Sequence, residues 1–237
     1  VIIFKSLSCL DTVVEDVHTI DPKYIPADVA MNKMDVNDPV GYGSFSMNRK
    51  VGTTVGQYSH AEGYITTASG YASHAEGSST TASGYYSHAE GSSTTAAGAY
   101  SHAEGWYTTA SGLHSHAEGS STTASGQYSH AEGSTTTASG YYSHAEGLGT
   151  TASGYYSHAE GRETIASGEA SHVQGQYNIE DKSNTYAHIV GNGVSDTSRS
   201  NAHTLDWQGN AWYSGDVYVG STSGTIRDDG SKKLATE

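Results

Sequence analysis

Histidine and glutamate recur together at one fixed spacing, and they are the residues of this chain best suited to chemistry. A His-x-Glu pair, such as His60 with Glu62 or His102 with Glu104, occurs eight times. Imidazole and carboxylate groups this close can form an acid-base pair or bind a metal ion. The histidines of the series, which includes a ninth without its glutamate, are His60, His74, His88, His102, His116, His130, His144, His158 and His172. Since their positions differ by 14 residues each time, their chemistry has to be judged together with the repeat that positions them.

The repeat is a seven-residue unit that runs from Gln57 to Gly175 without insertion or deletion. It begins QYSHAEG, YITTASG, YASHAEG, SSTTASG and continues for 17 units, in which two unit types alternate with a period of 14 residues. A coiled coil also has a heptad, but it needs large apolar residues at two positions and few glycines. Here small residues at the third, fifth and seventh positions alternate with His-x-Glu or Thr-x-Ser. This period of two predicts β-strands.

Glycine at every seventh position predicts a sharp turn after each strand, supplied by the unusual backbone angles that glycine allows. Two strands and two turns then close one coil, and successive coils stack as parallel strands about 4.8 Å apart. We expect the Ser/Thr, Ala and Gly set to fill a narrow lumen, with His and Glu facing outward or toward a neighbouring subunit. Such a roll buries little apolar surface, so we expect chains to associate. The contacts are predicted at tyrosine-rich variable positions: Tyr71, Tyr85, Tyr86, Tyr141, Tyr142, Tyr155 and Tyr156.

The alternating SHAEG and TTASG units resemble the head of YadA-like trimeric adhesins. The resemblance covers about half of the chain. It implies a left-handed parallel β-roll in which three chains pack side by side. The predicted fold class is therefore all-β: a parallel β-solenoid of 14-residue coils, homotrimeric, with a small C-terminal β module.

The flanking sequence divides the chain into three predicted parts. Residues 1–39 are expected to be an N-terminal arm or attachment segment. Residues 40–175 are the β-roll, whose irregular first coils at 40–56 cap the stack. Residues 176–237 are a C-terminal β-rich cap or neck with short strands and Gly-Asn or Asp-Gly type turns. The segment NAHTLDWQGNAWYSGDVYVG in this last part resembles tail-fibre and related proteins of bacteriophages and prophages.

Composition and charge exclude several classes of partner. The formal charge of −14, from 25 acidic and 11 basic residues, argues against nucleic acid, whose phosphates need clustered Lys and Arg. The one cysteine, Cys9, leaves no partner for a disulfide within the chain. No apolar run is long enough for a membrane span, and the apolar start VIIF lacks the features of a signal peptide. We expect no nucleic acid and no membrane insertion.

Repetition argues against catalysis, because an active site needs one asymmetric constellation and a ladder presents the same surface in every coil. We therefore predict that the protein is not an enzyme, and we assign no catalytic residue, cofactor or metal. Stacked imidazoles can bind Zn²⁺ or Ni²⁺ adventitiously, but the favoured interpretation is that His and Glu hydrogen-bond along and between coils. Residues 176–237 show no nucleophile and base at a recognisable spacing, so a self-cleaving segment is a lesser alternative.

Two further side-chain patterns suggest binding surfaces. Paired threonines, such as Thr66 and Thr67, raise an ice-binding interpretation. That design needs two outward Thr ladders, and adjacent residues of a strand point to opposite faces. Aromatic residues can stack on sugar rings, although the favoured alternative is packing between subunits. The candidate receptor or glycan contacts are Trp106, Tyr107, Trp207, Trp212 and Tyr213.

Together these features predict a structural or adhesive fibre protein outside the cell. The first interpretation is a phage or prophage tail-fibre component that spaces and presents a host-surface binding region. Its expected partners are two further copies of the chain, other fibre or baseplate proteins, and a bacterial or host cell-surface glycan or protein. The alternative is the head of a bacterial trimeric surface adhesin. An ice-binding solenoid is a more distant alternative.

Overall fold

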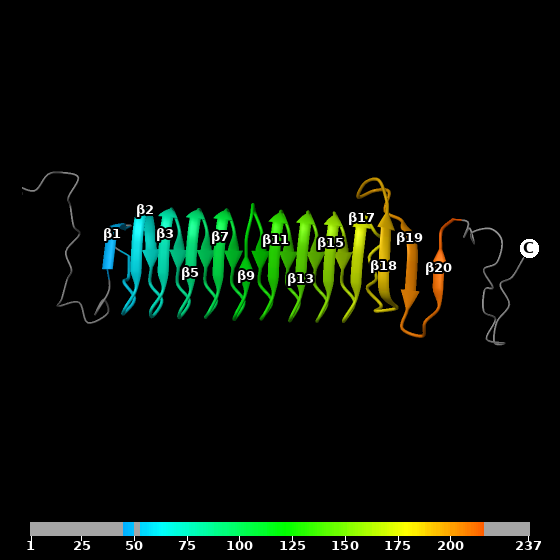
Figure 1. Cartoon of the computed structure of the whole chain (residues 1–237), viewed down its shortest axis with the longest axis horizontal. Coiled ribbons are helices and arrows are strands. Elements are labelled where there is room, and N and C mark those ends of the chain that lie inside the picture. The colour runs from blue at the N-terminus through cyan, green and yellow to red at the C-terminus, as the bar shows by residue number, and fades with distance from the viewer. Residues whose placement is uncertain (1–44, 50–52, 216–237) are drawn as a thin grey trace, which may run out of the picture. The chain divides into compact units, whose positions relative to one another are not determined.

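The structure, a computed structural model, describes residues 45–49 and 53–215. These form two compact units, one up to Ala110 and one from Ser111, which are described separately below as the first and second units. The described residues contain strands and turns and no helix, so none could cross a membrane as an apolar helix (Figure 1). Cys9 and the predicted arm at 1–39 lie outside the described residues, as does the last part of the predicted C-terminal module.

In the first unit, successive coils lie side by side and each contributes strands to two parallel sheets (Figure 1). The His sheet consists of the strands that begin at a ladder histidine, and the Thr sheet consists of Thr-Ala segments. β1 pairs in parallel with β2, with a register shift between Met47 and Arg49. The strands are β1 (Phe45–Arg49), β2 (His60–Ala68), β3 (His74–Ser78), β4 (Thr81–Ala82), β5 (His88–Ser92), β6 (Thr95–Ala96), β7 (His102–Trp106) and β8 (Thr109–Ala110).

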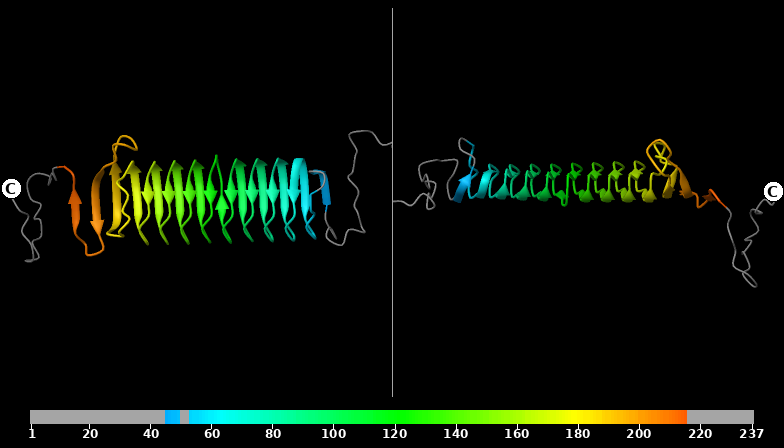
Figure 2. Two further views of the ribbon diagram at one scale, coloured as in Figure 1. Left: turned by 180° about the vertical axis from the view of Figure 1, so that it is seen from behind. Right: turned by 90° about the horizontal axis from the view of Figure 1, so that it is seen from above.

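The second unit repeats this arrangement and ends in antiparallel strands. Figure 2 shows its coils side by side from two further directions. β18 pairs in parallel with the last repeat strand and antiparallel with β19, which pairs antiparallel with β20. The strands are β9 (His116–Ala117), β10 (Thr123–Ala124), β11 (His130–Ser134), β12 (Thr137–Ala138), β13 (His144–Leu148), β14 (Thr151–Ala152), β15 (His158–Arg162), β16 (Ile165–Ala166), β17 (His172–Gln176), β18 (Tyr186–Asn192), β19 (Asn201–Asp206) and β20 (Ala211–Tyr213). The predicted all-β solenoid with a small C-terminal β module is confirmed.

The register places each residue opposite its equivalent 14 positions later, for example His130 opposite His144 and Thr137 opposite Thr151. Backbone hydrogen bonds follow the same step, so that the amide of His130 donates to the carbonyl of Ser143 at 2.9 Å. The alternation predicted from period two is confirmed. From Ser59 to Ser171 the lumen contains small side chains: the alanines of both sheets and the Ser and first Thr of each coil are buried.

Buried serines close the turn that precedes each His strand. Ser143 Oγ donates to the carbonyl oxygen of Gly140 at 2.8 Å, and Ser129 does the same to Gly126 at 2.7 Å. The equivalent bond recurs in the other coils of each unit. A buried hydroxyl with a backbone partner avoids the cost of an unpaired polar group, so serine fits this position in a lumen that has room for little else.

The repeat glycines lie close to the next coil, and the prediction that each one also supplies unusual backbone angles is right for nine of the 17. The glycine after His-x-Glu has a positive φ, for example +99° at Gly133. The glycine after Thr-x-Ser, such as Gly140, has none. It is needed because a Cβ there would overlap the carbonyl oxygen of Gly154 in the next coil.

The left-handed conformation at the turns belongs instead to the second residue of each seven-residue unit. Tyr142 has a φ of 55° and Ser121 a φ of 57°, and Tyr, Ala, Ser, Thr, His, Ile and Glu all occupy this conformation in different coils. Such a residue costs about 1–2 kcal/mol relative to the right-handed region. Backbone hydrogen bonds between stacked coils hold this conformation. The amide of Tyr142, for example, donates to the carbonyl of Gln127 in the preceding coil at 2.9 Å.

The Thr sheet ends at β16 in a polar cap. Asn178 is fully buried, and its Oδ1 accepts a hydrogen bond from the amide of Ile165 at 2.7 Å while its Nδ2 donates to the carbonyl of Ile165 at 3.0 Å. One side chain therefore replaces the next strand of the sheet. Arg199 Nη1 donates to the carbonyls of Glu163 at 2.8 Å and of Asn178 at 3.2 Å. These bonds protect an edge that would otherwise be open to pairing.

We expect Gly140→Ala to destabilise the fold although its backbone angles suit alanine. The added methyl has to push two coils apart, which costs about 1–3 kcal/mol or more, as in other overpacked interiors. Thermal unfolding followed by circular dichroism measures the change. Gly215→Ala is the control, because a Cβ at that position meets nothing within 4 Å. Equal melting points for the two variants would contradict the close-approach explanation.

We expect Asn178→Ala to destabilise the second unit by about 1–3 kcal/mol, the cost of leaving buried backbone groups unpaired. Urea unfolding of the full chain measures this difference. Asn192→Ala is the matched control, since Asn192 is exposed and its Oδ1 accepts only from the Ser200 hydroxyl. A loss in Asn178→Ala no larger than in the control would show that the side chain does not terminate the sheet.

Candidate functional site

The predicted His and Glu ladder lies on the outer face of the His sheet. In each coil the alanine between them is buried, so alternation along the strand turns both polar side chains outward. These His and Glu side chains are between 31% and 43% exposed where they pair. Neighbouring side chains thus cover roughly two thirds of each group, and the ladder is accessible along its whole outer rim.

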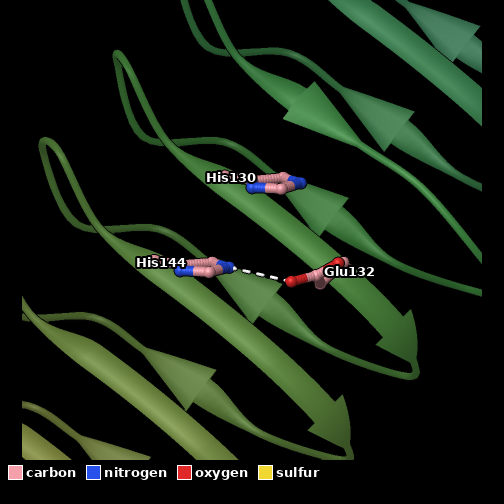
Figure 3. A group of neighbouring side chains, drawn as sticks. All are labelled: His130, Glu132 and His144. Carbon is pink, nitrogen blue, oxygen red and sulfur yellow. Dashed lines mark hydrogen bonds and ion pairs between the residues drawn. The ribbon is translucent and has the colours of Figure 1, made fainter.

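The imidazoles stack in columns within each unit. In the first unit, His74 and His88 have ring centroids 4.7 Å apart and planes within 2°. In the second unit, His130 and His144 are 4.8 Å apart with the same 2° angle (Figure 3). The distance is close to the spacing of parallel strands, so the stacking follows directly from the register.

Four ladder histidines of the second unit pair with the glutamate of the preceding coil, namely His130, His144, His158 and His172. Glu132 Oε1 lies 3.3 Å from Nε2 of His144, as the dashed line in Figure 3 shows, and the corresponding Glu146–His158 distance is also 3.3 Å. In the first unit, His60 and His74 pair instead with the glutamate of their own coil, at 3.3 and 3.7 Å. The predicted interaction along the coils is confirmed, with two patterns of partner.

Burial and like neighbours lower the pKa of several ladder histidines. At His130 burial is the main cause, followed by the neighbouring His144 imidazole, and Glu118 opposes both. At His158 burial again leads, followed by the imidazoles of the coils on either side. The stacked column therefore favours neutral imidazole over a line of adjacent positive charges.

The ladder continues one coil past the last predicted repeat. His188 on β18 stands opposite His172, with ring centroids 5.3 Å apart, and His203 on β19 follows at 5.6 Å from His188. Sequence reasoning missed both because the step from His172 to His188 is 16 residues and not 14. The signal was present in AHIVG at 187–191, which keeps the His-x-x-Gly spacing of SHAEG.

Tyrosines line the turn that precedes the His strand. Tyr86 stacks on Tyr100 at 5.1 Å in the first unit, and Tyr128 stacks on Tyr142 at 4.7 Å in the second. Most of these rings are 40% to 64% exposed. This tyrosine edge contains the positions that the sequence predicts as contacts between chains, which remains a prediction.

The five aromatic candidates for receptor contact are all exposed, two on the first unit and three on the second. Trp106 and Tyr107 lie on the first unit, edge to face at 4.5 Å. On the second unit, the adjacent β20 residues Trp212 and Tyr213 contact different rings, namely Tyr186 at 5.8 Å and His203 at 4.7 Å. Trp207 lies in the turn between β19 and β20.

The threonine pairs divide between the two faces of the strand as expected. The first threonine of each pair is buried and the second is partly exposed, as at Thr136 and Thr137. A single outward Thr ladder results. The two outward Thr rows of the ice-binding design are therefore not present on the described coils.

A family model for YadA head domain repeats, in two copies, matches residues 61–87, 117–143, 131–157 and 145–171. The last three matches are offset by one coil each, which is the step of the ladder itself. The repeat region is similar to a YadA-like β-roll head. The predicted resemblance is confirmed for these coils of both units. No curated protein matches the chain.

We expect the YadA-like roll to lose stability as the pH falls from 8 to 5. The folded-state pKa of His74, His130, His158 and His188 lies below the ordinary value, so the unfolded chain takes up protons first. This linkage removes stability as the pH drops through the unfolded-state value of about 6.5. Melting temperatures at constant ionic strength measure the effect.

Variants separate the ladder from other sources of pH dependence. The pair His130→Gln and His158→Gln should flatten the response, whereas His114→Gln, in a turn outside the ladder, should keep the wild-type slope. A melting temperature that is the same at both pH values would contradict the stacking argument.

Proposed function

We propose that the chain is the β-roll part of a homotrimeric adhesive fibre, which acts by presenting its surface and not by catalysis. The observation that carries this proposal is the match of the coils to YadA head repeats, since heads of this family are surface-exposed adhesin modules. The lumen of small residues and the unbroken backbone ladders support a rigid spacer. A repeated outer face supports multivalent contact more readily than a single asymmetric active site.

The thin interior supports association of three chains. In the regular coils the buried apolar groups are alanines, each of which contributes little on the scale of about 25 cal/mol per Å² of apolar surface. The exposed tyrosine edge offers the larger apolar area that the lumen lacks. Tyr85 and Tyr155 are 64% and 61% exposed, and packing of such rings against a second copy would supply burial that one chain does not.

The setting that we propose is a phage or prophage tail fibre, with other fibre or baseplate proteins as neighbours. The resemblance of the segment from Asn201 to Gly220 to tail-fibre proteins supports this choice. The alternative is the head of a bacterial trimeric surface adhesin, which the family match supports. The complete gene and its neighbours discriminate: a baseplate-attachment domain among virion genes indicates a fibre, and a membrane anchor indicates an adhesin.

A cell-surface glycan or protein is the proposed receptor class. Among the five candidates, Trp106 and Tyr107 are the pair that we favour, because both rings are exposed and meet edge to face at 90°, and exposed aromatic rings can stack on sugars. Three copies per fibre would raise weak single contacts to useful avidity.

We expect light scattering of the intact chain to give three times 24.8 kDa. We expect a trimer because one roll alone buries little apolar surface. Replacing Tyr85, Tyr86, Tyr155 and Tyr156 by serine should shift the mass toward the monomer, while Trp106→Ser with Tyr107→Ser should leave the trimer intact if these two rings contact a receptor and not a neighbouring subunit. A stable monomer of the unmodified chain would overturn the trimeric proposal.

A further inference from the structure

Two groups of three ligand-forming side chains occur in the second unit, each made from neighbouring coils. In each group two histidines and one glutamate place one potential ligand atom apiece within 4.8 Å of one another. The groups are His130, Glu132 and His144, shown in Figure 3, and His158, Glu160 and His172. They share no residue, so both could be occupied at once.

We propose that each of these His–Glu–His groups binds a divalent late transition-metal ion such as Zn²⁺. The inference goes beyond the proposed fibre function and does not depend on it. Two imidazole nitrogens and one carboxylate oxygen form a donor set that suits Zn²⁺ and Ni²⁺. Ca²⁺ and Mg²⁺ prefer a set of six or more oxygen ligands, whereas each of these groups offers two imidazoles and one carboxylate.

The backbone holds the ligands of each group in place before an ion arrives. His130 and Glu132 flank the buried Ala131 on one strand, and His144 stands directly opposite His130 in the next coil. Parallel backbone pairing fixes the separation of these Cα positions, so only the side chains have to adjust. One coil thus supplies two ligands of each site, and the next coil supplies the third.

Binding requires the stacked rings to rotate. The planes of His130 and His144 are within 2° of parallel, so their nitrogen lone pairs do not converge. An ion at about 2.0–2.1 Å from each nitrogen needs both rings to tilt toward Glu132. The side chains of His144 and Glu132 are 35% and 34% exposed, so part of each side chain faces solvent.

Charge favours the same outcome. Each group carries one carboxylate on a chain with a formal charge of −14. Glu132 Oε1 lies 3.3 Å from His144 Nε2, which is long for a charge-assisted hydrogen bond. An ion between them would replace this weak contact with coordination by both groups.

The first unit offers a different donor set. Its two groups, Glu76 with His88 and Glu90, and Glu90 with His102 and Glu104, contain one imidazole and two carboxylates each and share Glu90. These two groups compete for the Glu90 carboxylate, and each has one nitrogen ligand where the groups of the second unit have two. They should therefore bind Zn²⁺ more weakly. The structure thus predicts two tight ions per chain, both in the second unit.

The test is a titration of the full chain with ZnCl₂ in the presence of a competing chromophoric chelator, with bound metal counted by elemental analysis. The expected result is two tight Zn²⁺ per chain. His144→Gln together with His172→Gln should abolish this tight binding, a loss exceeding the roughly 10- to 100-fold typical of removing an outer-shell partner. His114→Gln removes an imidazole from a turn outside the ladder and should change nothing.

Further readouts keep the proposal falsifiable if the double histidine variant folds poorly. Glu132→Gln with Glu160→Gln leaves the imidazole column intact and should also lose tight binding. In the wild-type chain, Zn²⁺ should shift the imidazole NMR signals of the four histidines of these groups and spare that of His114. Zn²⁺ binding that survives both double variants, or the absence of tight binding by the wild-type chain, would show adventitious binding only and overturn the proposal.

Discussion

The close approach of backbone between successive coils is the constraint on which the rest of this structure depends. Gly140 lies so near the carbonyl of Gly154 that even a methyl group would overlap it. The turns can therefore close only around glycine, and the rise per coil is held at the spacing of parallel strands. A coil this tight leaves a lumen that accepts Ala, Ser and Thr. Larger buried side chains, Val173 and Ile189, appear only where the regular repeat ends.

Because the rise per coil is fixed, equivalent outward side chains of successive coils form columns. Within each unit the imidazoles stack because their Cα atoms are held opposite one another, and the tyrosines of the turn stack for the same reason. Columns of like groups are costly when charged, which explains why the histidine pKa values fall where burial and neighbouring imidazoles act together. The glutamates offset part of this effect by standing between successive histidines.

The termination of the roll shows what the repeat itself does not supply. A solenoid exposes unpaired backbone at its last strand, and here the Asn178 amide takes the place of the missing strand at Ile165. The His sheet continues instead through β18 and reverses into β19, so its backbone groups pair with the C-terminal module. The two sheets of one solenoid thus end by different means, one with a side chain and one with an antiparallel strand.

The sequence alone determined the coil, its period and its two faces. The period of two assigns side chains to the two faces of each strand, and the strict period of 14 residues brings equivalent residues opposite one another when the coils stack. Thr136 inward and Thr137 outward follow from that pattern without coordinates. The pattern could not assign the left-handed turn residue, since Gly140, which is needed for close approach alone, looks the same in sequence as Gly133, which also has a positive φ. Only the tertiary structure decided that His144 pairs with Glu132 of the coil before it and that His188 extends the column. These contacts depend on how side chains lean between coils, and a perfectly repeated sequence carries no signal that distinguishes one coil's glutamate from the next.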